Sequence, residues 1–350
     1  EYLNRFDYTP DDCLDFHSAI EKVVMPFANK LIKKRKDELG LKMLKPWDLS
    51  VDSLNRAPLK PFENAEELEI KCHNIFNSVD SELGNYFKIM RDGKLLDLAN
   101  RKGKAPGGYC TEYPHRRVPF IFMNAVGTHS DVQTMLHEGG HAFHVFESDK
   151  LPYSAQRDVG MEFAEVASMS MELLSSPYLT KEYGGFYEKE EAKRARIEHL
   201  EKTIMFLPYM AVVDAFQHWA YTNPEMAIEP KNCDEKWTEL WNRFQVYDDL
   251  DSSEFEDVIA TGWHNKLHLF HVPFYYVEYG MAQLGAIQVW GNALENQKNA
   301  VKQYRHALSL GGNATLPELF EAAGAKFEFG ENMLKYAVNL VETNLKELNA

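Results

Sequence analysis

Two histidines and a glutamate stand close together in the segment His137-Glu138-Gly139-Gly140-His141. Helical residues four apart project from the same face, so the imidazoles of His137 and His141 can reach one metal ion. Glu138 would project beside that ion, where its carboxylate can take a proton from water. The spacing therefore predicts a zinc site that catalyses hydrolysis, most simply of a peptide bond.

The residues around this motif have the pattern of a packed helix. Thr128 and Ser130 are both suitable N-caps, and Asp131 falls in the first turn. Apolar residues suit a packed face at Val132, Met135, Leu136, Ala142, Phe143 and Phe146. A third histidine, His144, falls on the same face as the first two. Each glycine inside the helix costs about 1 kcal/mol relative to alanine, which indicates a close approach by substrate or a neighbouring helix.

A catalytic zinc site needs three protein ligands and one open position. The segment Arg157–Leu174 reads as a largely buried helix, in which unpaired acidic residues are rare. Glu165 lies in its most apolar part and is the candidate third ligand. Glu172 lies on nearly the same face and Glu162 is offset by about 60°. We take Glu162, Glu172 and His144 as candidates for groups that orient the ligands, with solvent exposure as the alternative for the glutamates.

These two segments together resemble the thimet oligopeptidase and oligoendopeptidase F family of zinc peptidases. That family combines a His-Glu-x-Gly-His-x-x-His helix with a second helix holding a glutamate in a Phe-x-Glu-x-x-Ser context. The matching residues here include Gly140, His144, Phe163, Glu165 and Ser168. The resemblance implies that His137, His141 and Glu165 bind one Zn²⁺ per chain. It also implies that Glu138 activates water.

The segment 263–280 is rich in histidine and tyrosine. It resembles the family segment that closes over the substrate. Tyr276 and Tyr279 keep the family's three-residue spacing, so the resemblance implies that they stabilise the oxyanion. His268 is the best match for the family's histidine, and His264 and His271 are the alternatives. A phenol aimed at developing charge in a dry site is worth about 3 kcal/mol. Amphipathic packing with wet hydroxyl groups is the other interpretation of these tyrosines.

A turn-rich loop precedes a short strand ahead of the proposed zinc helix. The loop contains Gly107, Gly108 and Tyr109, and the strand is expected over Val118–Asn124. Zinc peptidases commonly add an extended substrate to such an edge strand through main-chain hydrogen bonds. The three loop residues are therefore candidates for substrate binding, and the resemblance implies that loop and strand line the substrate channel.

The rest of the chain is expected to be mainly helical. The expected helical ranges include 12–39, 63–90, 187–208, 210–221, 233–247, 273–296, 317–323 and 331–348. The resemblance implies a two-lobed, mainly α metallopeptidase with a small β-sheet next to a deep substrate channel. We expect one peptidase catalytic domain over 1–350, with a helical part in 1–100 and a zinc-bearing part in 101–350. Family members are usually longer, so a further helical region is expected upstream.

Composition narrows the function classes. The chain has 350 residues, 45% hydrophobic content and a net charge of −15, which fits a globular protein and disfavours nucleic acid as a partner. It has no apolar run of about 18 residues, so no membrane span is expected. The four cysteines lack paired spacing, which indicates reduced thiols in a cytoplasmic protein and makes them poor zinc candidates. Short peptides are the expected substrates, and the oligomeric state is not readable.

Three other interpretations remain open at this point. The chain could be a dipeptide-releasing metallocarboxypeptidase of the same helical class. It could also be a zinc- or peptide-binding protein without catalysis, although the intact Glu138 favours an enzyme. A helical scaffold with histidines that bind no metal is the third.

Overall fold

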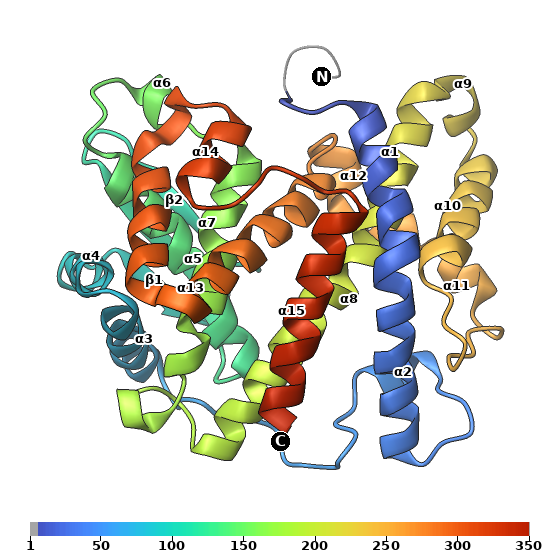
Figure 1. The fold of residues 1–350 in the computed structure, drawn as a ribbon, viewed down its shortest axis with the longest axis horizontal. Coiled ribbons are helices and arrows are strands. Elements are labelled where there is room, and N and C mark those ends of the chain that lie inside the picture. Colours follow the sequence, from blue (N-terminus) through green and yellow to red (C-terminus); the bar gives the residue numbers. More distant parts are fainter. Residues whose placement is uncertain (1–5, 350) are drawn as a thin grey trace. The chain divides into compact units, whose positions relative to one another are not determined.

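The computed structural model describes residues 6–349, and most of them are helical (Figure 1). The helices are α1 (Pro10–Ala19), α2 (Met25–Leu39), α3 (Ala65–Val79), α4 (Ser81–Asp92), α5 (His129–Ser148), α6 (Ser154–Arg157), α7 (Met161–Ser175), α8 (Lys189–Thr222), α9 (Pro224–Ala227), α10 (Pro230–Phe244), α11 (Glu256–Ala260), α12 (Leu267–His271), α13 (Tyr276–Leu310), α14 (Leu316–Ala322) and α15 (Glu331–Asn349). Three short strands complete the fold. A mainly α fold with a small sheet is thereby confirmed.

Two compact units make up the described chain, and each is assembled from separate stretches. The first unit comprises residues up to Ala57, His199–Met281 and the stretch from Glu328 onward. The second unit comprises Pro58–Glu198 and Ala282–Phe327. The expected boundary at residue 100 falls inside the second unit, so it does not separate these two units. One catalytic domain over the whole chain stays a prediction.

The small sheet belongs to the second unit. Its strands are β1 (Leu96–Ala99), β2 (Tyr109–Tyr113) and β3 (Val118–Ala125), in the order β1-β3-β2. The central strand β3 runs parallel to β1 and antiparallel to β2. Helix α5 packs against β3 and β2. The strand expected from Val118 is confirmed, but its expected position at an edge is wrong, because β3 is paired on both sides. The edge strands of this sheet are β1 and β2.

Aromatic side chains form much of the core around α5. Phe76 of α3 packs edge-on against Phe143 of α5, with ring centroids 4.9 Å apart, and lies 5.0 Å from Phe87 of α4. All three rings are fully buried. An aromatic pair of this kind contributes about 1 kcal/mol beyond the apolar area that it buries. Helix α5, which carries the motif, is therefore packed against α3 and α4 on one side and against the sheet on the other.

In the first unit, α1 and α2 follow one another as almost one rod (Figure 1). A single π-helical turn, Ile20–Val24, joins them, and α15 packs against that turn. Thr9 caps α1 through a reciprocal pair of hydrogen bonds with Asp12. The helix expected over 12–39 is confirmed, with the π turn as a local irregularity that no pattern in the sequence announced.

Two long helices differ from their expected ranges. α8 runs unbroken from Lys189 to Thr222 with Pro208 inside it, so the two helices expected there are wrong. Proline removes one main-chain donor, but the neighbouring Leu207 and Met210 are fully buried, and their packing keeps the helix continuous. α13 extends to Leu310, although non-helical torsion angles at Asn296 mark a break at the expected end.

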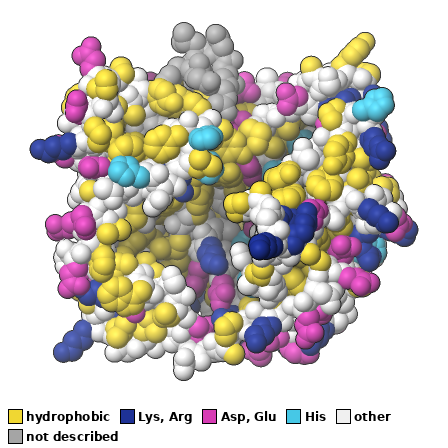
Figure 2. All heavy atoms as spheres, turned by 180° about the vertical axis from the view of Figure 1, so that it is seen from behind, with side chains coloured by type: hydrophobic (Ala, Val, Ile, Leu, Met, Phe, Trp, Pro, Cys, Tyr) yellow, Lys and Arg dark blue, Asp and Glu magenta, His cyan; other side chains and the backbone are white. Residues whose placement is uncertain are grey.

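The surface mixes apolar and charged side chains. Figure 2 shows acidic and basic groups interspersed with hydrophobic ones over one face. Exposed large apolar residues include Trp47, Leu54 and Ile228. Within residues 6–349, no helix combines the length and apolar character that crossing a bilayer requires.

Candidate metal centre

Helix α5 starts from a strongly anchored N-terminus. The side chain of Thr128 accepts a hydrogen bond from the amide of Asp131 at 3.3 Å. In return, Oδ2 of Asp131 accepts hydrogen bonds from the amides of Val126, Gly127 and Thr128 at 2.8–2.9 Å. A carboxylate in the first turn also suits the positive end of the helix dipole. Of the two caps that the sequence allowed, Thr128 is the one that the structure uses, and Ser130 lies inside the first turn.

The three expected metal ligands converge. One donor atom from each of His137, His141 and Glu165 lies within 4.8 Å of the others. Oε2 of Glu165 lies 3.3 Å from Nε2 of His137 and 3.7 Å from Nε2 of His141. The glutamate is buried while both histidines are only partly exposed. The i, i+4 pair on α5 and the acid on α7 therefore face one small space.

Backbone contact between α5 and α7 brings these ligands together. A Cβ atom on Gly140 would stand 2.5 Å from the carbonyl oxygen of Ala167 and 2.6 Å from Cα of Ser168. The buried hydroxyl of Tyr304 donates a hydrogen bond to the same Ala167 carbonyl at 2.8 Å. Gly140 is thus required by the close approach of a neighbouring helix, one of the two causes that the sequence suggested for the glycines.

Hydrogen bonds hold two of the ligands in place. Nδ1 of His137 lies 2.7 Å from Oε1 of Glu172, so its Nε2 is turned toward Glu165. The hydroxyl of Ser168 donates to Oε2 of Glu165 at 3.0 Å and to the main-chain oxygen of that residue at 3.0 Å. This contact gives a physical reason for the serine three residues after the glutamate. Such outer partners fix ring orientation and ligand basicity in metal sites.

The charges of the group suit a divalent cation. Burial lowers the pKa of His141 to about 4, which keeps its ring neutral and able to donate a lone pair. Burial also disfavours the charged form of His137, but hydrogen bonds to Glu165 and Glu172 outweigh it and raise its pKa. The protonated form of His137 is stabilised by Glu165 and Glu172 on either side of its ring, so the site favours positive charge. Two imidazoles and one carboxylate are also a donor set that Zn²⁺ takes at catalytic sites, so these residues fit the ion.

Glu138, the candidate general base, follows His137 directly on α5. This residue is 7% exposed and stands between the two histidines in the sequence of α5. Burial raises the pKa of Glu138 to about 7, the neighbouring His137 opposes that rise, and the charge of Glu165 adds to it. The main-chain amide of Cys110 on β2 also acts to lower this pKa. The carboxylate therefore stands beside both the metal ligands and the edge strand.

Two other acidic or basic candidates lie outside the converging group. His144 is buried, with its ring edge-on to Phe163 at 6.1 Å. Burial and then His141 lower its pKa to about 3, so it is a neutral core residue. Glu162 is buried in the first turn of α7. Their proposed orienting roles stay predictions, whereas Glu172 does contact a ligand.

The loop candidates lie where the edge strand begins. Gly107 has a φ of +96°, which a residue with a side chain rarely adopts, and its carbonyl accepts a hydrogen bond from Asn124 at 2.9 Å. A Cβ on Gly108 would meet Thr134 of α5 at 3.1 Å. Tyr109 starts β2, is half exposed and stacks on Phe122 with centroids 5.0 Å apart. Their proposed role in binding substrate stays a prediction.

The oxyanion candidates form a cluster of their own in the first unit. The ring of His268 lies 5.1 Å from that of Tyr276 and 5.9 Å from that of Tyr279. His264 and His271 are exposed, so His268 is the histidine that packs with the tyrosines. Lys266, which no motif indicated, donates a hydrogen bond to the hydroxyl of Tyr276 at 3.1 Å. Burial lowers the pKa of this lysine.

The chain is similar to known peptidases in sequence and in structure. The chain is 24% identical to the oligoendopeptidase F homolog of Borreliella burgdorferi over 93% of its own length and 54% of that protein. It is 24% identical to oligopeptidase PepF of Bacillus subtilis over 93% of its length and 47% of that protein. Among solved structures it is similar to PZ peptidase A with an inhibitor, with a TM-score of 0.89 and 31% identity. That alignment covers 98% of this chain and 59% of the other.

The chain therefore spans about half the length of the curated relatives that it matches. A family model described as peptidase family M3 matches residues 2–338. With nearly the whole chain matched, this protein belongs to peptidase family M3.

Proposed function

We propose that this chain carries the catalytic centre of a zinc-dependent oligoendopeptidase that hydrolyses short peptides. The observation that carries the proposal is the convergence of His137, His141 and Glu165 with Glu138 beside them. A helical binding module without catalysis would have no need for a buried carboxylate at that position. The names of the curated relatives support the choice of oligopeptides as substrates.

Zinc is the metal that this donor set favours. A Zn²⁺ ion held by His137, His141 and Glu165 would act as a Lewis acid on the scissile carbonyl and lower the pKa of water to about 7. Glu172 would keep the Nε2 of His137 directed at the ion, and Ser168 would do the same for the carboxylate of Glu165. The protein's own contribution to metal binding is thus the orientation of donors before the ion arrives.

Proton transfer is the part assigned to Glu138. Its carboxylate would accept a proton from the attacking water and later deliver that proton to the leaving amine. Because it is buried, the carboxylate holds its proton more readily than an exposed glutamate does. A nearby dication would oppose this effect, and the balance keeps the base usable near neutral pH.

Peptide binding and oxyanion stabilisation are assigned to two further groups. Main-chain groups of the edge strand β2, which begins at Tyr109, would bind the substrate as an added strand. Tyr276 and Tyr279, with His268, would donate hydrogen bonds to the oxygen that gains negative charge. Main-chain recognition of this kind accepts varied side chains, which suits broad sequence preference.

All four cysteines are free thiols, which supports a reducing compartment such as the cytoplasm.

An internally quenched peptide, blocked at both ends, tests the proposal. We expect the purified chain to contain one zinc ion at the peptidase centre and to cleave the blocked peptide. A chelator should abolish cleavage, and added zinc should restore it. His141→Ala should lose both this ion and the activity, while the exposed His115→Ala serves as the matched control and keeps both.

The products decide between the remaining interpretations. Mass spectrometry should show internal cleavage of peptides whose ends are blocked. Release of dipeptides only from peptides with a free C-terminus would reject the endopeptidase in favour of a carboxydipeptidase. Zinc binding without cleavage of any peptide would instead indicate a binding protein.

A further inference from the structure

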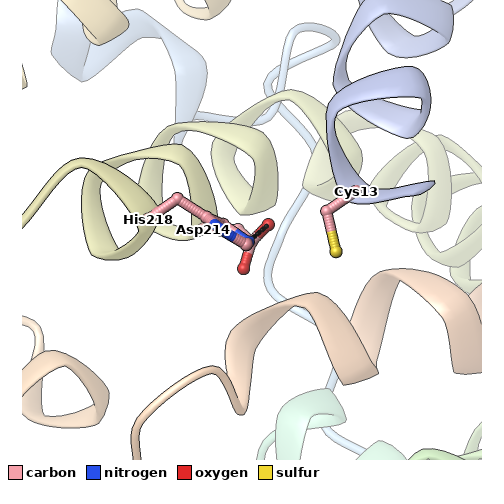
Figure 3. A group of neighbouring side chains, drawn as sticks. All are labelled: Cys13, Asp214 and His218. Carbon is pink, nitrogen blue, oxygen red and sulfur yellow. Dashed lines mark ion pairs between the residues drawn. The ribbon is translucent and has the colours of Figure 1, made fainter. Parts of the chain in front are cut away.

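A second set of metal-ligating side chains lies in the first unit, on two facing helices. Cys13 and His17 stand one turn apart on α1, and Asp214 and His218 stand one turn apart on α8. Figure 3 shows the thiol of Cys13 beside the carboxylate of Asp214, with His218 on the same helix as the acid. Pairs of donors projecting from facing helices are a common way of building metal sites in helical proteins.

The distances within this set are short enough for one ion. The sulfur of Cys13, a carboxylate oxygen of Asp214 and a ring nitrogen of His218 lie within 4.8 Å of one another. Nε2 of His218 lies 3.3 Å from Oδ2 of Asp214, and Nε2 of His17 lies 2.8 Å from the same oxygen. A contraction of about 1 Å would give the ligand separations of a tetrahedral zinc site.

Burial makes the set chemically unusual. Cys13 is 2% exposed, His17 1% and Asp214 0%. Oδ1 of Asp214 has no hydrogen-bond partner among the residues that the structure describes. A buried carboxylate oxygen without a partner is costly, and a cation beside it would remove that cost. This atom and the neighbouring thiol point to a ligand that binds both.

The surroundings leave room for one small group. A cavity of about 10 Å³ is lined by Cys13, His218 and Phe274, together with residues at the start of the chain. That volume is close to the minimum for one water molecule. Phe274 has a φ of +58°, a strained conformation for a residue with a side chain, and its ring lies 5.2 Å from that of His218. An aromatic ring therefore packs against the imidazole of His218 beside this cavity.

We propose that Cys13, Asp214 and His218 bind a single Zn²⁺ ion as a structural site that joins α1 to α8. Thiolate, imidazole and carboxylate together favour zinc over harder cations such as Mg²⁺. On binding, the thiol proton leaves to solvent, and the thiolate and carboxylate balance the two positive charges. His17 orients the carboxylate of Asp214 through its contact with Oδ2, as outer partners do in metal sites. A water molecule would complete the four ligands of a tetrahedral ion.

Cobalt binding tests this site independently of peptidase activity. Sulfur is absent from the group formed by His137, His141 and Glu165, so a thiolate-to-cobalt charge-transfer band that disappears in Cys13→Ser belongs to the Cys13 site. We expect the metal-free chain to bind two Co²⁺ ions, one of them with that band. Cys13→Ser should lose the band and one ion, whereas Cys72→Ser, which removes a buried thiol of the second unit, should keep both. His141→Ala should lose the other ion and retain the band.

A single bound Co²⁺ without a charge-transfer band in the unmodified chain would overturn the proposal. So would a band that persists in Cys13→Ser. The number of ions bound by the unmodified chain tests the second site even if Cys13→Ser does not fold, and circular dichroism reports the folding of that variant separately. If the second ion is absent, the His17–Asp214 contact is a hydrogen bond between helices and nothing more.

Discussion

Oε1 of Glu172 lies 2.7 Å from Nδ1 of His137, and the opposite nitrogen of that ring lies 3.3 Å from Oε2 of Glu165. One imidazole is thus held between two carboxylates that come from the same helix, α7. The first contact fixes the tautomer and the ring angle, and the second marks the direction in which a metal ion would bind.

Glu172→Gln should weaken zinc binding. The amide can still contact the ring, but it removes the charge that makes the opposite nitrogen a better donor, so affinity should fall by roughly 10–100-fold. Competition with a chromophoric chelator measures this constant. The exposed Glu190→Gln is the matched control in the same unit, and equal affinities in the two variants would contradict the orienting role.

Glu138→Gln should separate metal binding from catalysis. The substitution keeps the shape of the side chain and removes only its ability to accept a proton, so turnover should fall by at least about a hundredfold. Zinc content, measured by atomic emission, should not change. Near-normal turnover in a variant that holds its zinc would show that another group is the base.

Tyr279→Phe should lower kcat with little effect on KM. A hydrogen bond that forms only as negative charge develops is worth about 10²–10³-fold in rate when lost. Tyr279 gives a cleaner test than Tyr276, because the latter hydroxyl also accepts a hydrogen bond from Lys266. Tyr275→Phe removes a phenol hydroxyl from the same aromatic cluster and should leave kcat unchanged. A larger loss in the Tyr275 variant would assign the oxyanion role to that residue.

Gly140→Ala should destabilise the protein and disturb the metal site together. The added methyl group would meet main-chain atoms of α7 at 2.5–2.6 Å, which cannot rotate away as a side chain can. Overpacking of this kind costs about 1–3 kcal/mol, more than the roughly 1 kcal/mol that alanine gains in a helix. Urea unfolding should show the loss, and Gly330→Ala, with open space around it, should be close to neutral.

Asp97→Asn should cost stability at neutral pH and little at acid pH. A paired hydrogen bond to Arg101 lowers the pKa of Asp97 to about 2 against opposition from burial, and Lys104 adds to the effect. An unfolded aspartate has a pKa of about 3.9, so the ionised form stabilises the fold above about pH 4. That contribution disappears as the pH falls toward 2.

The variant cannot titrate at this position, so the comparison isolates the carboxylate. At about pH 6 the variant should be about 1–3 kcal/mol less stable, because Lys104 is 1% exposed and loses its charged partner. As the pH falls from about 4 toward 2, the difference between the urea concentrations at which the two proteins unfold should shrink steadily. A difference that does not change with pH would show that the cost comes from packing.

Local signals in the sequence were enough to predict helix α5, which carries His137 and His141. The cap at Thr128, the apolar spacing and the acid in the buried segment are each determined by residues within a few turns of one another. The structure starts α5 after Thr128 and buries Glu165 as expected. The acidic residue stood out because burial of a carboxylate needs a partner, and that argument requires no knowledge of the fold.

Features that depend on distant residues were not predictable in this way. The contact between His17 and Asp214 joins residues 197 positions apart, and nothing near either one announces the other. Cys13 was dismissed as a ligand because cysteine spacing was compared only with other cysteines. The helix α8 continues through Pro208 because the residues beside it are buried. Helix propensity read from the local sequence does not take this burial into account.

The contact at Gly140 has a consequence for how this centre tolerates change over evolutionary time. Main-chain atoms of one helix rest on the other where the ligands emerge, so their separation does not depend on which side chains fill the surrounding interior. Drift in those apolar positions would alter stability while the spacing of the donors stayed constant. The apolar core residues can therefore change faster than the metal-binding residues. Gly140 makes this possible, because its lack of a side chain sets the distance between α5 and α7.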